Sequence, residues 1–219
     1  MKPLFIVVVL AALLTTFTMC NSVTVSDVTV IPLTKKFGEI TANPAPKYNP
    51  VVHLNDKDGF FCTGFVIDAN YIATAGHCLH DNNSLITEDI NIISDTGEDT
   101  GVVAQAAGFA TRSDFGLVTG DFSNFKYFAA EFQNFGFNEK DYYTCGFPYG
   151  VKRMVCTPFN PVQTSYFSIF GRGFIIPGFS GGAVVRASDG VVVGINSAAR
   201  EGGIIVYPLQ GFLGIFGIE

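Results

Sequence analysis

Charged residues are scarce in this sequence, and basic ones are scarcer than acidic ones. Its 219 residues include 13 Lys and Arg against 19 Asp and Glu, which gives a formal net charge of −6 at pH 7. A nucleic-acid surface needs clustered Lys and Arg to neutralise phosphates, and no run of them occurs. Only 15% of the residues are charged and 48% are apolar, a balance typical of a compact globular protein rather than a disordered one.

Long apolar runs are equally scarce, with one exception at the N-terminus. Residues 1–22 contain Lys2, then a nearly unbroken apolar stretch over residues 4–14, then small and polar residues. This order is typical of a secretory signal, and the stretch is too short to span a bilayer comfortably. We therefore expect a secreted or extracytoplasmic protein without a membrane span. Either cleavage after Ser22 releases a soluble product, or Cys20 carries a lipid anchor, although the residue before it is bulky.

The chain has five cysteines, an odd number. Exported proteins tend to pair their cysteines, and Cys20, in the N-terminal segment, is the natural odd one. The other four allow three connectivities. Sequential pairs, Cys62 with Cys78 and Cys145 with Cys156, are favoured because each closes a short loop that fits two adjacent strands. A free reactive thiol is the alternative.

From about residue 48 onward, short runs of β-branched and aromatic residues are broken by Gly, Asn, Asp and Pro. This pattern predicts an all-β sandwich or barrel. The tripeptide Ser188-Asp189-Gly190 predicts a hairpin turn between the last two runs. The expected strands include residues 51–54, 61–67, 71–75, 91–94, 115–120, 144–150, 183–187 and 191–197.

The two flanks of this region have other patterns. Leu209, Phe212, Leu213 and Phe216 recur at helical spacing and predict a short C-terminal helix that packs on the body. Residues 23–47 alternate at first and then become rich in Pro, Lys and Asn. They form either a leading strand with a connector or a pro-segment that is removed later.

Two short motifs point to chemistry. TAGHC at residues 74–78 supplies His77 beside a cysteine, and GFSGG at residues 178–182 supplies Ser180 in a glycine-rich turn. A serine hydroxyl is a poor nucleophile at neutral pH. It needs a base within hydrogen-bond reach, a group that orients the base, and donors for the oxyanion. His77 and Ser180 are the first two parts of such a set.

Together with SDFGLV at residues 113–118, these motifs resemble those of the chymotrypsin-like serine peptidases, over roughly residues 50–210. The resemblance implies an all-β fold of two packed six-stranded antiparallel β-barrels, with the active site in the cleft between them. It puts the first barrel at residues 48–130 and the second, with the C-terminal helix, at residues 131–219. The cysteine pair around His77 looks like the family's disulfide beside the catalytic histidine.

The same resemblance implies roles for individual residues. His77 would be the general base, Asp114 the acid that orients it, and Ser180 the nucleophile. The backbone N–H groups of Gly178 and Ser180 would form the oxyanion hole. The implied activity is that of a serine endopeptidase on protein or peptide substrates, without a cofactor, and activity should fall at acid pH as His77 takes up a proton. A non-catalytic binding module and an esterase are the alternatives.

Substrate preference also follows from the resemblance. Phe174 and the residues up to Pro177, with Ser197, Ala198 and Ala199, would line the primary specificity pocket, and the region of Ile205 would close its far side. No carboxylate falls at the pocket base, which disfavours Lys and Arg side chains. No histidine lies in the second barrel, which removes one way of recognising Glu. We expect an apolar pocket for aliphatic or aromatic side chains.

One residue departs from the family pattern. Digestive members carry an aspartate just before the nucleophile, where it pairs with a newly cut N-terminus, but this chain has Phe179. It also lacks the Ile-Val-Gly-Gly segment at which that cut is made. We expect packing of Phe179, rather than a terminal charge, to hold the oxyanion turn.

Other readings of the motifs are weaker. GFSGG also fits the nucleophile elbow of α/β-hydrolases, but there a histidine must follow the serine, and none occurs after His80. DFG at residues 114–116 occurs without the other kinase motifs. The cysteines and histidines around residue 77 could hold zinc, but disulfides are favoured in an exported chain, so no metal is expected. His53 and His80 are interpreted as a strand residue and a solvated loop residue without chemical roles.

Overall fold

A computed structural model describes five parts of the chain: residues 39–40, 47–128, 142–164, 168–209 and 212–217. The expected signal with Cys20 and Ser22, the boundary between residues 130 and 131, and most of residues 23–47 lie outside these parts. No helix among the described residues is long and apolar enough to cross a membrane.

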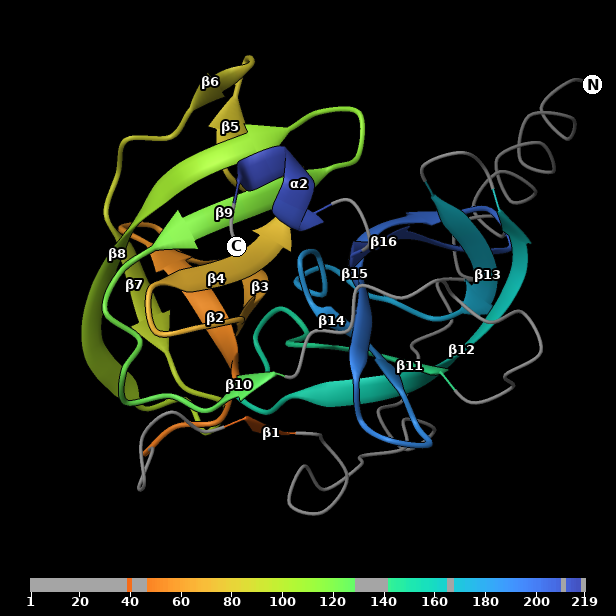
Figure 1. Cartoon of the computed structure of the whole chain (residues 1–219), viewed down its shortest axis with the longest axis horizontal. Coiled ribbons are helices and arrows are strands. Elements are labelled where there is room, and N and C mark those ends of the chain that lie inside the picture. Colours follow the sequence, from red (N-terminus) through yellow and green to blue (C-terminus); the bar gives the residue numbers. More distant parts are fainter. Residues whose placement is uncertain (1–38, 41–46, 129–141, 165–167, 210–211, 218–219) are drawn as a thin grey trace, which may run out of the picture.

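Six antiparallel strands close the first barrel, on the left in Figure 1. Their order around the barrel is β2-β3-β4-β9-β8-β7. The strands are β2 (Val51–Asp56), β3 (Gly59–Val66), β4 (Tyr71–Ala75), β7 (Ile90–Ile93), β8 (Asp99–Ala110) and β9 (Phe115–Thr119).

A second closed barrel, on the right in Figure 1, follows in the order β11-β12-β13-β16-β15-β14. The predicted fold of two six-stranded antiparallel β-barrels is therefore confirmed. Its strands are β11 (Tyr142–Gly146), β12 (Val155–Thr164), β13 (Ile169–Gly173), β14 (Ala183–Arg186), β15 (Val192–Arg200) and β16 (Gly203–Pro208).

Smaller elements decorate the barrels. The two-residue strand β1 (Glu39–Ile40) pairs with β10 (Tyr127–Phe128), and β5 (His80–Asp81) pairs with β6 (Ser84–Leu85). A 3₁₀ turn, η3 (Gly76–Cys78), follows β4.

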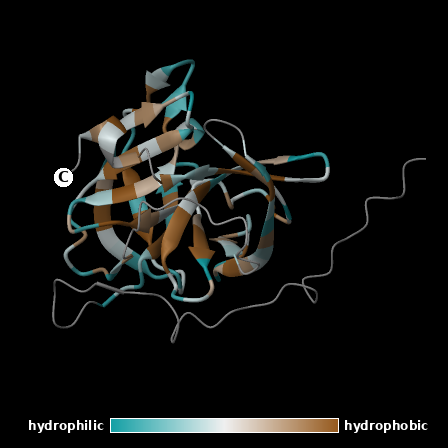
Figure 2. Ribbon diagram, turned by 45° about the vertical axis from the view of Figure 1, so that its right-hand side comes forward, coloured by the Kyte–Doolittle hydropathy of each residue, from teal (hydrophilic) through white to brown (hydrophobic). Residues whose placement is uncertain are grey.

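Alternating burial explains why these sequences close into barrels. In β7, Ile90 and Ile92 are fully buried and the residues after them only partly so. Successive side chains of a strand point to opposite faces, so one set fills the barrel and the other faces outward. Bulges in β8 and β12 bend the longest strands. Figure 2 shows hydrophobic residues concentrated on the strands of both barrels.

Each strand expected from the sequence overlaps an observed one. The range 144–150 is wrong in its second half, because β11 ends at Gly146 and Pro148 accepts a turn hydrogen bond from Val151. The predicted hairpin is confirmed: Arg186 N donates to the Val191 carbonyl at 2.9 Å between β14 and β15.

The C-terminal helix is also confirmed, as α2 (Phe212–Phe216). The buried ring of Phe212 lies 5.3 Å from the ring of Phe115 in an edge-on arrangement. Phe216 approaches Gly108, where a Cβ would lie 3.1 Å from its ring. The helix therefore packs on the first barrel through β8 and β9.

His53 and His80, the two histidines outside the motifs, are both at least partly buried. His80 begins β5, is half-buried, and its ring centroid lies 4.6 Å from that of Phe109, so the interpretation as a solvated loop residue is wrong. His53 lies on β2, as expected, and stacks on Phe147 at 3.6 Å. Burial lowers the pKa of His53 from 6.5 to about 4.

The lowered pKa of His53 predicts acid sensitivity of the fold. Between pH 4 and 6.5 the unfolded chain binds a proton at His53 that the folded chain does not, so the free energy of unfolding falls as the pH drops through this window. The loss attributable to His53 is roughly 3 kcal/mol. Urea unfolding at several pH values should show a shallower pH slope in His53→Leu. An unchanged pH slope in His53→Leu contradicts the assignment.

Candidate active site

His77 lies on η3, and a disulfide fixes this turn to the first barrel. Cys78 is bonded to Cys62 on β3, with 6.2 Å between the Cα atoms. The second disulfide joins Cys145 and Cys156, which are direct partners on β11 and β12. Both sequential pairings are thus present. The cysteine sulfurs near His77 are bonded to each other, so neither offers a thiolate to a metal ion.

Asp114 faces His77 from the residue before β9. Its Oδ1 accepts a hydrogen bond from the His77 backbone N–H at 2.8 Å, and its Oδ2 lies 2.8 Å from the ring Nδ1. Asp114 has a φ of 46°, and its carbonyl accepts from the Gly76 N–H at 2.7 Å. An ionised carboxylate only accepts hydrogen bonds, so Nδ1 carries the proton and Nε2 of the neutral ring is left as an acceptor.

Ser197, on β15 of the second barrel, is a further partner of this carboxylate. Its Oγ donates to Asp114 Oδ2 at 2.5 Å. From the sequence, Ser197 was expected only to line the pocket; its contact with Asp114 joins residues 83 positions apart, which share no local signal.

The environment of Asp114 favours its charged form. Burial raises the pKa of the Asp114 carboxyl, but the hydrogen bond and charge of His77, with the hydrogen bond from Ser197, outweigh it. The pKa consequently lies below its ordinary value of 3.8, and the carboxylate is ionised at neutral pH.

Ser180 lies in the turn before β14 and is partly buried. Its Oγ donates to the Ser197 carbonyl at 3.4 Å. Within the part of the chain that the structure describes, no hydrogen bond joins Ser180 to the His77 ring. Ser197 therefore contacts both Asp114 and Ser180: its hydroxyl donates to Asp114 and its carbonyl accepts from Ser180.

The backbone around Ser180 leaves two N–H groups available. Phe179 N donates to Ile176 O at 3.0 Å, and Gly181 N donates to Asn196 O at 2.8 Å. By contrast, the N–H groups of Gly178 and Ser180 have no hydrogen-bond partner among the described residues. Gly178 has a φ of +101°, a conformation that glycine adopts readily. These two N–H groups are the donors expected for an oxyanion.

The residues expected to line the specificity pocket are differently exposed. Phe174 is 43% exposed and its carbonyl accepts from Thr157 Oγ1 at 2.5 Å. Ser197 is buried, Ala198 is partly buried and Ala199 is exposed. The assignment of these residues to a substrate pocket stays a prediction.

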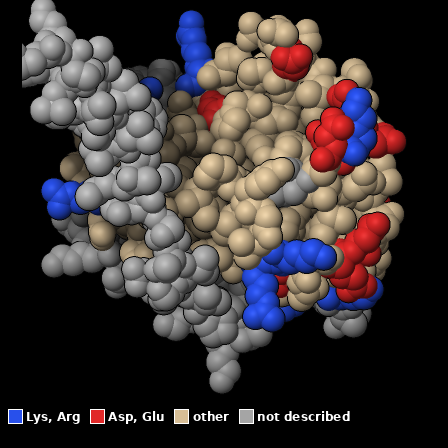
Figure 3. All heavy atoms as spheres, turned by 180° about the vertical axis from the view of Figure 1, so that it is seen from behind, with Lys and Arg blue, Asp and Glu red and all other residues tan. Residues whose placement is uncertain are grey.

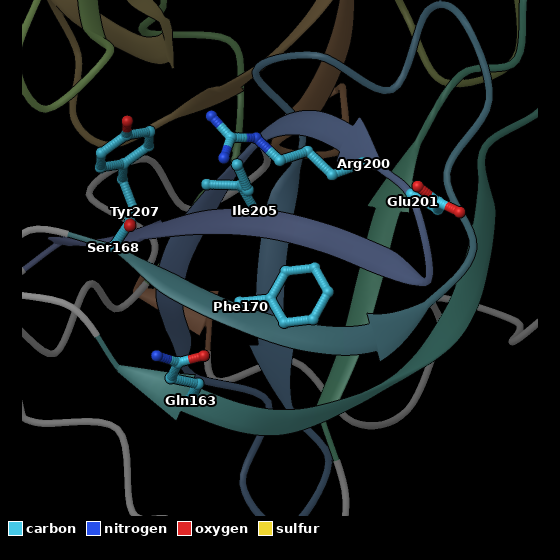
Figure 4. Close-up of a pocket in the computed structure, with 7 residues that line it drawn as sticks. All are labelled: Gln163, Ser168, Phe170, Arg200, Glu201, Ile205 and Tyr207. Carbon is cyan, nitrogen blue, oxygen red and sulfur yellow. The ribbon is translucent and has the colours of Figure 1, made fainter.

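An open cavity of about 550 Å³ lies where β15 continues beyond Ala199. Ile205 is the one residue named in advance among those that line it. In Figure 4, the Arg200 side chain extends toward Ile205 and Tyr207, and Glu201 lies at the other end. The cavity is lined by Gln163, Ser168, Phe170, Arg200, Glu201, Ile205 and Tyr207.

Tyr207 connects this cavity with the Asp114 site. Its ring centroid lies 6.1 Å from that of Phe115, the residue after Asp114. Burial raises the pKa of the Tyr207 hydroxyl, the charge of Asp114 raises it further, and the charge of Arg200 opposes both. Tyr207 therefore lines the cavity and also lies within the electrostatic influence of Asp114. On the face shown in Figure 3, acidic and basic side chains lie next to one another rather than in a basic patch.

A family comparison agrees with this geometry. The family model of the trypsin-like peptidase domain matches residues 62–195, which is more than half of the chain and includes His77, Asp114 and Ser180. The chain belongs to the trypsin-like peptidase family. Membership of this trypsin-like peptidase family supports peptidase activity. A search among curated proteins found no match.

The fold also resembles a solved structure, the crystal structure of the serine endoprotease from Yersinia pestis, with a TM-score of 0.64. The two sequences are 20% identical, so this likeness concerns the fold. The match covers 79% of this trypsin-like chain and 62% of that one, so the chain spans less than two thirds of the length of its solved neighbour.

Replacing Gly181, in the turn after Ser180, should destabilise the fold more than replacing Gly202. Gly181 and Gly202 share a left-handed φ, +82° and +81°, but a Cβ at Gly181 would clash with Thr74 Oγ1 and the Thr63 carbonyl, whereas Gly202 faces open space. Gly202→Ala should cost about 1 to 2 kcal/mol of unfolding free energy. Gly181→Ala should cost roughly 3 to 5 kcal/mol, because overpacking adds to the same strain. Urea unfolding of both variants checks this, and equal costs would contradict the close approach.

Proposed function

We propose that this protein is an exported serine endopeptidase that cleaves peptide bonds through an acyl-enzyme on Ser180. The observation that carries the proposal is the 2.8 Å contact between His77 Nδ1 and Asp114, with Ser180 bound to the same Ser197 that holds Asp114. These contacts support a catalytic set drawn from both barrels: a base, its orienting acid and a hydroxyl nucleophile.

The chemistry uses these residues in turn. His77 Nε2 takes the Ser180 proton while Oγ bonds to the scissile carbonyl carbon, and the carbonyl oxygen becomes an oxyanion beside the N–H groups of Gly178 and Ser180. As the C–N bond breaks, His77 returns the proton to the leaving amine. Water then attacks the acyl carbon and gives a proton to His77. As the ester bond to Ser180 breaks, His77 returns this proton to Ser180 Oγ and the acid product is released.

The resting hydroxyl must leave the Ser197 carbonyl to reach His77. Its present hydrogen bond is long at 3.4 Å, and long hydrogen bonds are weak. Catalytic hydrogen bonds are often loose before substrate binds and tighten in the complex. A change of the Ser180 side-chain torsion is therefore a small cost in this mechanism.

The export part of the proposal rests on the N-terminal sequence and on the disulfides. Two disulfides fit an oxidising compartment, and the charged start, apolar middle and small-residue exit of residues 1–22 fit a secretory signal. Signal cleavage after Ser22 and lipid attachment at Cys20 are the two products to distinguish by intact-mass analysis of the mature protein.

Covalent labelling tests the proposed nucleophile. An organophosphonate probe should give one adduct per chain, and Ser180→Ala should abolish it because no other serine among the described residues has an oriented base. Ser84→Ala, at an exposed serine on β6, is the matched control and should label normally.

Asp114→Asn should lower kcat on a peptide substrate by about 10⁴ because the imidazole loses its correct tautomer.

Other results of these experiments would favour the alternative functions. A folded parent protein that takes no label and cleaves no peptide would favour a non-catalytic binding module on the same barrels. Turnover of activated esters without any peptide cleavage would favour an esterase.

From the position of Arg200, we expect the enzyme to prefer substrates with a negative charge at a residue N-terminal to the cleaved bond. We expect a substrate that lies along β15 to direct a side chain into the adjoining cavity, where Arg200 has no ion pair within the described residues. Exposed ion pairs are weak, so peptides with Asp rather than Lys there should gain only about fivefold in kcat/KM. Arg200→Glu should reverse the preference. Arg172→Glu, on β13 outside the cavity, should leave it unchanged; a preference that ignores Arg200 contradicts the assignment.

A further inference from the structure

Thr63 lies on β3, next to the disulfide-bonded Cys62, and is fully buried. Its backbone faces two neighbours at the site. Its N–H donates to the Ser180 carbonyl at 2.9 Å, and its own carbonyl accepts from Thr74 Oγ1 at 2.8 Å. These contacts use the main chain, which any residue offers.

The Thr63 side chain adds two contacts that depend on its hydroxyl. Oγ1 donates to the Gly178 carbonyl at 2.7 Å and accepts from the Phe147 N–H at 3.0 Å. Thr63 belongs to the first barrel, whereas Phe147 follows β11 and Gly178 precedes β14 of the second. A single buried hydroxyl therefore joins the two barrels directly at the turn that carries Ser180.

These contacts fix the direction of the peptide groups in the turn. The carbonyls of Gly178 and Ser180 both point at Thr63, the first at its hydroxyl and the second at its N–H. The intervening Phe179 carbonyl accepts from Gly182 N at 2.9 Å. Because each peptide group is planar, holding the Gly178 carbonyl fixes the N–H of Phe179, and holding the Phe179 carbonyl fixes the N–H of Ser180. The N–H of Gly178 belongs to the peptide group of the Pro177 carbonyl, which accepts from Tyr149 N at 2.8 Å. Thr63 therefore holds the peptide group that lies between the N–H groups of Gly178 and Ser180, which have no hydrogen-bond partner among the described residues.

The side chain of Phe179, just before Ser180, places the turn by apolar packing, but this packing does not orient the peptide groups. Phe179 is 1% exposed and packs against Gly146, where a Cβ would lie 2.9 Å from the Phe179 Cα. Apolar packing places the turn but is non-directional, so it does not fix the rotation of a peptide group beside a flexible glycine. A hydrogen bond from a buried hydroxyl does, because hydrogen bonds weaken steeply when they bend.

We propose that the Thr63 hydroxyl is a positioning group for the oxyanion site: by holding the Gly178–Phe179 peptide group toward the first barrel, it fixes the segment that joins the Gly178 and Ser180 N–H groups and keeps both aimed at substrate. The role rests on the proposed peptidase function and deepens it. The oxyanion site is then organised by a side chain within the fold rather than by a charge on a new chain terminus.

The test compares Thr63→Val, which keeps the shape and removes the hydroxyl, with Thr63→Ser, which keeps the hydroxyl. Turnover is measured per active site, after titration with an organophosphonate. Thr63→Val should lower kcat on a peptide substrate by about 10 to 100-fold, somewhat less than the loss of a direct oxyanion donor. KM should stay within about threefold. Binding of a peptide boronate, which mimics the tetrahedral intermediate, should weaken by the same factor as kcat, and Thr63→Ser should restore both.

Thr144→Val is the matched control. Thr144 is another fully buried threonine, and its Oγ1 lies 2.9 Å from Thr157 Oγ1 in the second barrel. This variant should lose stability without losing turnover per titrated site, since it leaves the Ser180 turn intact. Where Thr63→Val does not fold, Thr63→Cys keeps the side-chain volume with only a weak donor and gives the same comparison.

The outcomes separate the two proposals. A Thr63→Val variant that is folded and turns over within threefold of the parent, or a loss that Thr63→Ser does not restore, overturns the positioning role while the peptidase function stands. A folded parent that neither labels at Ser180 nor cleaves peptides overturns the proposed function, and the positioning role with it.

Discussion

The site depends on one carboxylate shared between two barrels. Asp114 accepts from the backbone and the ring of His77 in the first barrel and from Ser197 in the second. Removing a carboxylate from water is unfavourable, and here the hydrogen bonds outweigh that cost, so the pKa of Asp114 lies below its ordinary value. A shift of one barrel relative to the other would break the Ser197 contact and leave the carboxylate with His77 as its partner. The arrangement of the barrels and the chemistry of the site are therefore coupled.

The nucleophile turn is held by a second set of contacts across the same interface. Thr63 binds carbonyls on either side of Phe179, and Gly181 has no room for a side chain between Thr74 and Thr63. Two barrels packed in this way provide rigid strands on both sides of a short turn. Rigid support of this kind keeps donors aimed at a developing charge without reorganisation during the reaction.

Local sequence predicted the parts of the fold that depend on alternation and on turns. Runs such as residues 71–75 are apolar and β-branched, and they are strands. The strand β8 was not named, because its 12 residues carry glycines and alanines and expose most of one face. The strand β12 contains Pro158 and Pro161, which weaken a strand signal. Both are strands because neighbouring segments supply their hydrogen bonds.

For the candidate site too, local sequence predicted some residues and missed the contacts that the fold creates. His77, Asp114 and Ser180 lie in recognisable motifs, so the sequence alone proposed them. The contacts of Ser197 and Thr63 join residues 83 and 115 positions apart, and nothing in either local sequence marks them. His80 was misjudged because its burial comes from Phe109, on a strand that the sequence did not reveal.

A crystal structure of the mature protein with a peptide boronate tests the central claim most directly. The account predicts a covalent bond from boron to Ser180 Oγ, with one boronate oxygen about 3 Å from the backbone nitrogens of both Gly178 and Ser180. It also predicts that His77 Nδ1 stays hydrogen-bonded to Asp114. A boronate attached elsewhere, or a boronate oxygen that meets neither nitrogen while His77 has turned away from Asp114, would contradict it.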